Sequence, residues 1–373
     1  MHISNLHLVN FKNYEETSVS FGKGITGFVG PNGSGKTNVL DAIYYLSMCK
    51  SYLNVLDRQN IRFNEAFFSI MGDWIKDEQK YQLHCAVKLN AKKVFRKNKK
   101  EYERLADHIG QFPVVMISPY DRDLISEGSD LRRRWMDGIL SQLDREYLDS
   151  VQRYAKILDH RNALLKNMFE HRLFDQESIE PWNVQLAEVG NRIHERRKEF
   201  TIQFIPYFQD FYQNISSGSE EVSFTYRSQL EEGNLLDLLK ESERKDAITQ
   251  YTNVGIHKDD LVFLINGHPV KKFGSQGQQK SYIIALRLAQ YEWMKNHLNE
   301  KPVLLLDDIF DKLDHQRVSK LLELVSNNYF GQVVVTDTDE DRLAGIFGHL
   351  TIDKRLFQVN FGKITELDLK IHE

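Results

Sequence analysis

Gly30-Pro31-Asn32-Gly33-Ser34-Gly35-Lys36-Thr37 is a complete GxxxxGK[ST] pattern, the sequence of a phosphate-binding loop. The apolar run 25–29 precedes it and predicts a strand, and the apolar residues of 39–46 follow at helical spacing. Glycines let backbone N–H groups approach phosphate oxygens closely, and the helix N-terminus adds partial positive charge. Lys36 is expected on the β- and γ-phosphates and Thr37 on Mg²⁺.

A second apolar run ends in two carboxylates. Residues 302–308 read PVLLLDD, and a strand this uniformly apolar is typical of a parallel sheet covered on both faces. Ligands bind at the carboxyl ends of such strands. Asp307 is the candidate Mg²⁺ ligand, and Asp308 is the candidate residue that orients the attacking water. Alone the pattern is weak, but beside a phosphate loop it indicates a nucleotide-hydrolysing site.

A third segment offers another anion-binding helix start. Residues 274–280 read GSQGQQK and precede a predicted helix from about 277. Ser275, Gln276, Gly277 and Gln278 could present N–H groups and a hydroxyl to a phosphate. The plain alternative is a polar N-cap. Because the phosphate loop already serves the nucleotide of its own subunit, we expect this segment to contact the γ-phosphate held by another subunit.

Composition excludes several classes of protein. The chain has 373 residues, a net charge of −4, 41% apolar and 27% charged residues, and a mean hydropathy of −0.48. It contains no run of about 18 uncharged apolar residues, so no membrane span is expected. The N-terminus lacks a signal-peptide pattern, which favours a cytoplasmic protein. Cys49 and Cys85 are too few for a disulfide scaffold and are expected to be reduced core thiols.

The middle of the chain predicts a short helical arm. Leu148, Val151, Ala155, Leu158, Asn162, Leu165 and Phe169 recur at alternating spacings of three and four, the pattern of a helix–helix seam. Leu186, Ile193, Phe200 and Tyr207 repeat every seven residues on a second helix, which Pro206 is expected to end or kink. Pro181 is expected between the two helices. A helix over 143–170 would span roughly 42 Å.

Basic residues concentrate in one place despite the negative net charge. Residues 92–104 carry seven basic and two acidic side chains. Six of them form the candidate DNA-binding set, which is Lys92, Lys93, Arg96, Lys97, Lys99 and Lys100. Phe95 and Tyr102 are candidates for stacking on bases. The plain alternative is a solvated strand edge protected by lysines. Arg132–Arg134 form a second basic group, of which at least one is expected to brace the junction between lobes.

These motifs together resemble the SMC/RecF-type family of ABC ATPases. The resemblance is carried by residues 2–16 and 27–47, SPYDRDLISEGSDLRRRWMD at 118–137, GIHKDDLVFLINGHPVKKFGSQGQQKS at 255–281 and PVLLLDDIFDKLD at 302–314. It implies an α/β fold, a P-loop ABC-type ATPase head with an inserted short helical arm lobe. We expect residues 1–120 and 251–373 to form the head, with the segment 274–280 in its second part. Residues 121–250 are expected to form the arm.

The resemblance also implies functional positions. Ser275–Gln279 takes the position of the family's signature motif, with Gln276 in place of a usual glycine. Leu313-Asp314 takes the position of the loop that follows the strand ending in Asp307 and Asp308. Thr336 takes the position of the switch histidine, and Asp121 is a candidate for that of the Q-loop glutamine. Lys36, Ser275 and Asp308 are the catalytic candidates, residues 30–37 and 275–278 the ATP-binding ones, and Thr37 and Asp307 the Mg²⁺ ligands.

The implied function is that of a cytoplasmic DNA replication and repair ATPase. The resemblance implies weak DNA-stimulated ATP hydrolysis, an ATP-dependent homodimer and action as a clamp on single-stranded or gapped DNA. It further implies partners of the RecR and RecO type, help with RecA loading, and induction of the SOS response to DNA damage. The alternative is an SMC-like chromosome-organising head, which the short arm disfavours. A transporter ATPase subunit would lack both the arm and the basic run.

Overall fold

The computed structural model describes residues 1–172, 174–216, 220–309 and 329–368. The sequence also predicts a helix over 315–327, and this segment and the loop Leu313-Asp314 lie outside the described residues. The chain divides into two compact units. The first comprises Met1–Asp121, Asn214–Ser217 and Ile284–Glu373, and the second comprises Arg122–Gln213 and Gly218–Ile283.

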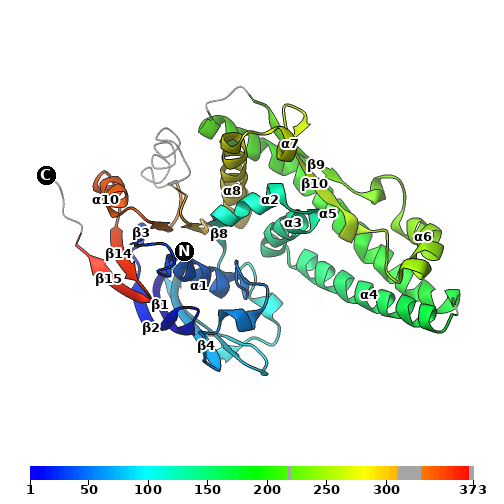
Figure 1. Ribbon diagram of the computed structural model, residues 1–373, viewed down its shortest axis with the longest axis horizontal. Helices are drawn as coiled ribbons and strands as arrows, with labels where there is room; N and C mark the ends of the chain where they lie inside the picture. Colours follow the sequence, from blue (N-terminus) through cyan, green and yellow to red (C-terminus); the bar gives the residue numbers. More distant parts are fainter. Residues whose placement is uncertain (173, 217–219, 310–328, 369–373) are drawn as a thin grey trace. The chain divides into compact units, whose positions relative to one another are not determined.

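A mostly parallel sheet forms one half of the first unit (Figure 1). Its strand order is β15-β14-β3-β13-β12-β8, and the pairs from β14 to β8 are all parallel. Four of these strands, β3, β8, β12 and β13, are buried along their whole length, which the sequence predicts for the apolar run that forms β12. The bounds are β3 (Ile25–Val29), β8 (Val114–Ile117), β12 (Val303–Leu306), β13 (Val333–Asp337), β14 (Lys354–Asn360) and β15 (Lys363–Leu367).

An antiparallel sheet forms the other half, with the order β2-β1-β4-β5-β6-β7. Its strands alternate buried and exposed residues, the pattern of a sheet with one covered face. Gln332 connects the two sheets, since its side-chain amide exchanges hydrogen bonds with the backbone of Ile3. The bounds are β1 (His2–Phe11), β2 (Tyr14–Ser20), β4 (Phe67–Lys76), β5 (Gln79–Lys88), β6 (Val94–Lys97) and β7 (Lys100–Glu101).

Helix α1 (Lys36–Met48) lies in the core between these sheets. Leu40, Ile43 and Leu46 are fully buried, and each such side chain contributes about 1.5–3 kcal/mol by leaving water. Asp41 is also buried, and Lys12 Nζ binds its carboxylate at 2.6 Å. The core therefore fixes the helix that begins at the phosphate loop. Helix α10 (Glu340–Gly348) packs on β3, and short 3-10 turns cover Asp57–Asn60, Leu105–Asp107 and Pro119–Arg122.

The two cysteines are buried free thiols in this core, as the composition predicts. Burial raises the pKa of the Cys49 thiol to about 12. Both thiols therefore remain protonated at neutral pH and contribute as apolar side chains.

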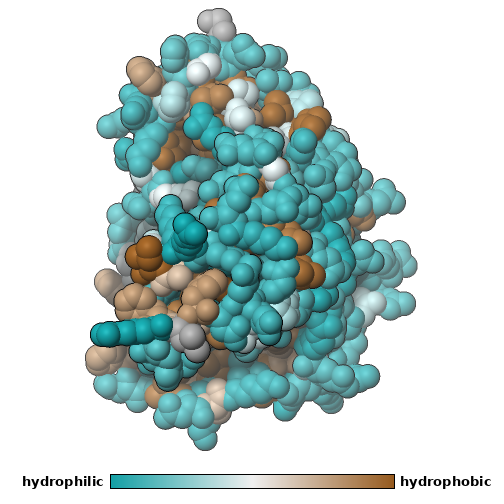
Figure 2. Space-filling model, turned by 90° about the vertical axis from the view of Figure 1, so that its right-hand side faces the viewer, coloured by the Kyte–Doolittle hydropathy of each residue, from teal (hydrophilic) through white to brown (hydrophobic). Residues whose placement is uncertain are grey.

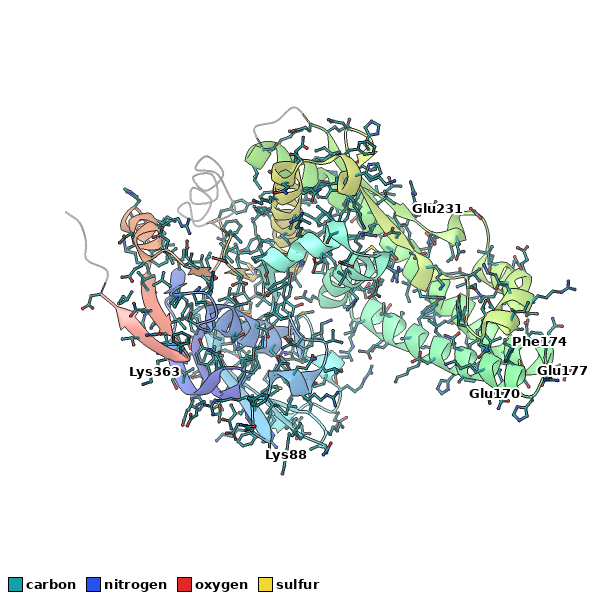
Figure 3. The ribbon with its side chains drawn as sticks, viewed as in Figure 1. Lys88, Glu170, Phe174, Glu177, Glu231 and Lys363 are labelled. Carbon is teal, nitrogen blue, oxygen red and sulfur yellow. The ribbon has the colours of Figure 1, made fainter. Side chains whose placement is uncertain are left out.

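The second unit contains the predicted antiparallel helical pair. Helices α4 (Arg145–Glu170) and α5 (Gln176–Ser216) run side by side (Figure 1). Figure 3 shows Glu170, Phe174 and Glu177 together at the end where α4 passes into α5. The unit also contains a three-stranded sheet in the order β11 (His268–Pro269), β10 (Asp260–Ile265) and β9 (Val222–Arg227), and the buried side chain of Trp135. Trp135 lies edge-on to Phe200, Phe204, Phe224 and Phe263.

The remaining elements of the second unit are shorter. The helices are α2 (Asp123–Ser126), α3 (Ser129–Leu143), α6 (Leu235–Thr249) and α7 (Val270–Phe273), with 3-10 turns at Gln229–Glu231 and Ile256–Lys258. The strands are β9 (Val222–Arg227), β10 (Asp260–Ile265) and β11 (His268–Pro269). Helix α8 (Gln276–Leu298) starts in the second unit and continues into the first.

The expected end of the second arm helix is wrong. Both Pro181 and Pro206 lie inside α5, which runs for 41 residues. The apolar face continues across Pro206, because Phe204 and Phe208 on either side of it are fully buried. Packing of such residues offsets the roughly 3 kcal/mol that an internal proline costs. The heptad positions Leu186, Ile193 and Phe200 are buried as predicted.

The expected seam of the first arm helix is also largely wrong. Of its seven positions only Leu165 is fully buried, while Phe169 is 51% exposed. The buried positions are instead Tyr147, Tyr154, Ile157, Arg161, Leu165 and Met168. Arg161 occupies the seam because its guanidinium binds Asp246 at 2.7 Å and Asn183 at 2.8 Å, both fully buried. A buried charge is tolerated when it is paired and hydrogen-bonded.

The first expected boundary between lobes agrees with the structure to one residue, and the second does not. Residues 251–283 belong to the second unit, because β10 pairs with β9 and its Phe263 packs on Trp135. The signature segment therefore lies in the second unit, whereas the sequence assigned it to the ATPase head. Among the described helices, none combines the length and apolar character needed to cross a membrane.

Candidate nucleotide site

The phosphate loop joins β3 to α1 with the backbone its glycines permit. Gly30, Gly33 and Gly35 have φ values of 150°, 76° and 118°, which side chains rarely adopt. A Cβ at Gly30 would lie 2.2 Å from the carbonyl oxygen of Val359, and one at Gly35 would lie 2.5 Å from Asn13. The loop thus follows the predicted strand and opens the predicted helix, the geometry of an anion cradle.

Lys36 lies over this loop. Its Nζ donates to the carbonyl oxygens of Gly30 at 2.7 Å and Pro31 at 3.0 Å. The cation is therefore held beside the backbone N–H groups to which a phosphate would bind. A phosphate entering the cradle would meet a positive charge already in place.

The turn between β1 and β2 braces the same loop. Asn13 Nδ2 donates to the carbonyl of Ser34 at 2.8 Å, and Tyr14 donates to that of Gly35 at 3.0 Å. Asn38 in turn donates to Asn13 at 2.7 Å. These contacts escaped the sequence analysis, which assigned no role in the site to Asn13 or Tyr14.

Thr37 lies in the first turn of α1, and Asp307 follows the last residue of β12. Thr37 Oγ1 donates to Asp307 Oδ1 at 2.8 Å. The described residues contain no group of three or more His, Cys, Asp or Glu that could hold a metal ion. A hydroxyl and one carboxylate suit Mg²⁺, which binds through one or two protein ligands, substrate phosphates and water. The residues present therefore fit a magnesium–nucleotide complex.

Two hydroxyls that the sequence did not single out for this carboxylate also contact Asp307. Ser118 Oγ, just after β8, lies 3.3 Å from Oδ2, and Thr336 Oγ1, in β13, donates to Oδ1 at 2.9 Å. Burial raises the pKa of Asp307, and the hydrogen bonds from Thr37 and Thr336 oppose that shift. Thr336, which the resemblance led us to expect at the switch-histidine position, thus contacts the carboxylate directly. Parallel pairing of β8 and β13 beside β12 is the signal that could have revealed both.

Asp308 follows with a left-handed backbone, at φ 48°. Its N–H donates to Thr336 Oγ1 at 2.9 Å. This conformation turns the chain sharply after β12, so consecutive carboxylates leave the strand in different directions. Aspartate tolerates a positive φ better than most residues do.

Asp121 does not have the surroundings of a phosphate-site residue. Its Oδ1 accepts from Tyr52 and from Arg287 Nη2, the latter at 2.5 Å, and its Oδ2 accepts from the N–H of Ser118 at 2.9 Å. Burial alone would lower the pKa of Arg287, but Asp121 raises it overall. The pair is a buried ion bridge between α8 and the end of β8. Ser118, three positions earlier, is the residue that reaches Asp307.

The signature segment forms a reciprocal cap at the start of α8. Gln278 N–H donates to Ser275 Oγ at 3.2 Å, and Ser275 N–H donates to Gln278 Oε1 at 2.7 Å. Gln278 also donates to Glu220 at 2.9 Å. The polar N-cap is thus present, while Ser275 and Gln276 remain exposed to an incoming anion. The side chain of Gln278, a predicted nucleotide contact, is engaged within its own subunit.

The basic run is divided by the structure. Lys93 Nζ is held by Cys49 O at 2.7 Å and Asp57 Oδ2 at 2.8 Å, and Lys97 Nζ by Gln111 at 2.6 Å. These two are structural cations, contrary to the expectation, because acceptors distant in sequence surround them. Lys92, Lys99 and Lys100 are exposed, and Arg96 is partly exposed near Glu101.

Base stacking by the aromatic residues of this run is not supported. Phe95 is 1% exposed, and its ring packs against His108 with centroids 4.5 Å apart. Tyr102 donates to His108 Nδ1 at 3.1 Å. Phe95 belongs to the hydrophobic core, and Tyr102 is partly buried and packs against that core.

Arg132–Arg134 act within the second unit. Arg132 makes a two-pronged ion pair with Asp260 at 2.8 and 3.1 Å, and Arg133 donates to the carbonyl of Asp259 at 2.6 Å. Arg134 pairs with Asp130 one turn earlier. These contacts fasten α3 to β10, so the expected brace between lobes is replaced by a brace inside one lobe.

Known proteins share this sequence and fold. A family model described as the RecF/RecN/SMC N terminal domain matches residues 2–352. The chain is 49% identical over 346 residues to the DNA replication and repair protein RecF of Flavobacterium johnsoniae, covering 93% of this chain and 96% of that protein. It is 46% identical to the RecF of Phocaeicola vulgatus, covering 98% of each.

Solved structures agree with that assignment. The recombination mediator protein RecF-ATP of the RecFOR pathway superposes with a TM-score of 0.89 at 28% identity, over 98% of this chain and 97% of that chain. An SMC head domain from Pyrococcus furiosus, 17% identical, matches with a TM-score of 0.56 over 99% and 97%, which shows the fold alone. This chain therefore belongs to the RecF family, within the RecF/RecN/SMC group of ABC-type ATPases.

Proposed function

We propose that this protein is an ATP-hydrolysing DNA-binding protein of replication and recombinational repair, which forms a clamp on single-stranded or gapped DNA when ATP joins two copies. The observation that supports it most is the meeting of Lys36, Thr37 and Asp307 at one edge of the parallel sheet. The names of the relatives support the repair role.

Each site residue has a role in this proposal. Lys36 binds the β- and γ-phosphates, Thr37 and Asp307 hold Mg²⁺, and Asp308 orients water. Ser275 to Gln278 close on the nucleotide of the second copy. Lys92, Lys99 and Lys100 contact the DNA backbone, with Arg96 at their edge. Thr336 senses the γ-phosphate through its bond to Asp307.

The cellular part of the proposal follows the relatives. A relative of known structure acts in the RecFOR pathway. By analogy this protein works in the cytoplasm with RecR- and RecO-type partners, aids RecA loading and contributes to SOS induction. The SMC-like alternative is disfavoured by the arm, whose α4 has 26 residues and spans roughly 39 Å.

Sedimentation velocity tests the central claim. We expect a monomer without nucleotide, a dimer with ATP and Mg²⁺, and a monomer again with ADP. Ser275→Arg should stay monomeric while calorimetry shows unchanged ATP binding. Ser126→Arg changes an exposed serine elsewhere in the second unit and is the matched control. A Ser275→Arg protein that dimerises like the parent would refute the signature assignment.

A rate measurement tests the DNA part. Gapped duplex DNA should raise the ATPase rate, whereas lipid vesicles should leave it unchanged. An ATPase rate that is unchanged by single-stranded, gapped and duplex DNA would contradict the DNA-stimulated activity.

A further inference from the structure

Three exposed lysines flank the signature segment. Lys271 and Lys272 lie in α7 and Lys280 in the second turn of α8, and all three are exposed. Gln279 Nε2 donates to the carbonyl of Gly274 at 2.9 Å, so α7 is held against the start of α8 (Figure 1). Within the described residues these lysines make no ion pair, and Glu220 instead accepts a hydrogen bond from Gln278. We call these three lysines the signature edge.

The phosphate loop has an acidic neighbour in the first unit. β13 pairs in parallel with β3, Asp337 lying opposite Val29, so the residue after each strand emerges at the same edge. Adjacent strands lie about 4.8 Å apart, which places the start of α10 close to Gly30. Asp339, Glu340 and Asp341 are exposed there and form the α10 edge. Asp337 is excluded because Arg342 neutralises it.

Glu340 and Asp341 have no ion-pair partner in the part of the chain that the structure describes. Asp339 caps α10 by accepting from the N–H of Arg342 at 3.0 Å. Figure 2 turns the right-hand side of Figure 1 towards the viewer, and hydrophilic residues cover most of that face, with apolar residues in separate groups.

We propose that in the ATP-dependent dimer the signature edge of one copy contacts the α10 edge of the other. This inference rests on the proposed dimer, in which the signature segment of each copy closes on the phosphate loop of its partner. The residues that flank the signature segment of one copy must then face the residues that flank the phosphate loop of the other copy. The flanks are basic and acidic, respectively, and a two-fold axis makes the contact twice. Such complementarity selects the partner and its orientation.

The occupant of the signature edge is better taken as a second copy than as DNA. A nucleic acid approaching these lysines in the dimer would meet the acidic α10 edge and the nucleotide phosphates at the same place. The second copy instead brings the opposite charge to each edge. Sequence-independent DNA binding through these lysines is kept as the rival outcome.

Two charge-reversed proteins test the contact. One carries Lys271→Glu and Lys272→Glu, and the other carries Glu340→Lys and Asp341→Lys, leaving the Asp339 cap intact. Each alone should place like charges opposite one another at both contacts. We expect the ATP-dependent dimerisation constant to weaken at least about tenfold for each, since several exposed pairs change sign together. ATP binding by each monomer should remain.

Mixing the two proteins gives the decisive result. In a mixed dimer both contacts again join opposite charges, so an equimolar mixture with ATP should dimerise like the parent. Recovery also shows that neither variant is misfolded. The control carries Lys156→Glu and Lys166→Glu, at exposed positions of α4. It makes the same change of net charge as the Lys271→Glu, Lys272→Glu protein and should dimerise normally.

The outcomes separate the inference from the dimer itself. A parent protein that stays monomeric with ATP overturns both. A parent that dimerises, with reversed variants that also dimerise, overturns the edge contact alone. Loss of gapped-DNA binding by the Lys271→Glu, Lys272→Glu protein without loss of dimer assigns the lysines to DNA and likewise overturns it. If the equimolar mixture of the two reversed variants does not recover dimerisation, the edge contact is overturned as well.

Discussion

The hydroxyl of Thr37 donates to the carboxylate of Asp307 over 2.8 Å, although 270 positions separate the two residues. The contact joins the first turn of α1 to the end of β12, two elements that meet through the buried core. The hydroxyl and carboxylate are thus assembled by the fold itself, so side-chain changes there should affect nucleotide chemistry more than folding.

Lys36→Ala should reduce ATP affinity by about 10- to 100-fold, since a charge-assisted hydrogen bond contributes about 1.5–3 kcal/mol. Lys36→Arg should keep binding but hydrolyse slowly, because a planar guanidinium does not replace a compact ammonium. Isothermal titration measures the affinity, and thermal unfolding checks the fold. Unchanged affinity in the alanine protein would remove Lys36 from the phosphate site.

Asp308→Asn should preserve ATP binding and accumulate dimer while lowering kcat by about 10²- to 10⁴-fold, the usual contribution of a positioned base. Asparagine also accepts the positive φ of 48° at this position, so backbone strain should not confuse the result. Single-turnover ATPase kinetics provide the measurement. Parental turnover in this variant would show that another group orients the water.

Replacing Lys92, Lys99 and Lys100 by alanine should weaken binding to all duplex sequences alike, because backbone contacts carry no base code. The slope of log affinity against log salt should become shallower by about 0.9 for each lost contact. Lys93→Ala, in contrast, should mainly lower stability, because its amine holds Asp57 and the carbonyl of Cys49. The same salt slope in the triple variant and the parent would leave this run as a solvated edge.

Arg287→Met should destabilise the first unit by about 3–5 kcal/mol, because it leaves Asp121 charged and buried. Adding Asp121→Asn should recover part of that loss, since the amide carries no charge. Urea unfolding of the two single variants and the double variant gives the coupling free energy. Strict additivity would contradict a direct pair.

His108 predicts a pH dependence of stability. Its side chain is fully buried, and its Nε2 donates to the carbonyl of Leu46 at 2.7 Å. Burial lowers its pKa from 6.5 to about 4, so the folded state favours the neutral ring. The contribution is complete above pH 6.5 and is lost as pH falls towards 4, up to about 3 kcal/mol. His108→Gln should flatten unfolding free energy against pH in that window, and an unchanged profile would exclude His108.

The backbone of the phosphate loop and of the strand before Asp307 was predictable because its signals are local. The glycines of 30–35 and the apolar run before Asp307 determine their own backbone, and parallel pairing brings them together. The assignments that failed depend on distant partners. From the sequence alone Lys93 looks like a surface lysine, but in the structure it pairs with Asp57. Arg161 likewise looks like part of the polar side of a helix, but it pairs with the buried Asp246. Pro206 reads as a helix end, but aromatic packing on both sides continues the helix.

The strand order of the parallel sheet also bears on how the protein is made. β3, at residues 25–29, lies between β13 and β14, which begin at residues 333 and 354. During synthesis on the ribosome this strand cannot pair until its partner strands are translated, more than 300 residues later. In contrast, β1, β2 and β4 to β7 all lie within the first 101 residues and can pair early. The whole of the second unit also lies earlier in the sequence than β13. Domains generally fold as units during synthesis, so the arm should be structured on the nascent chain before the phosphate loop is complete.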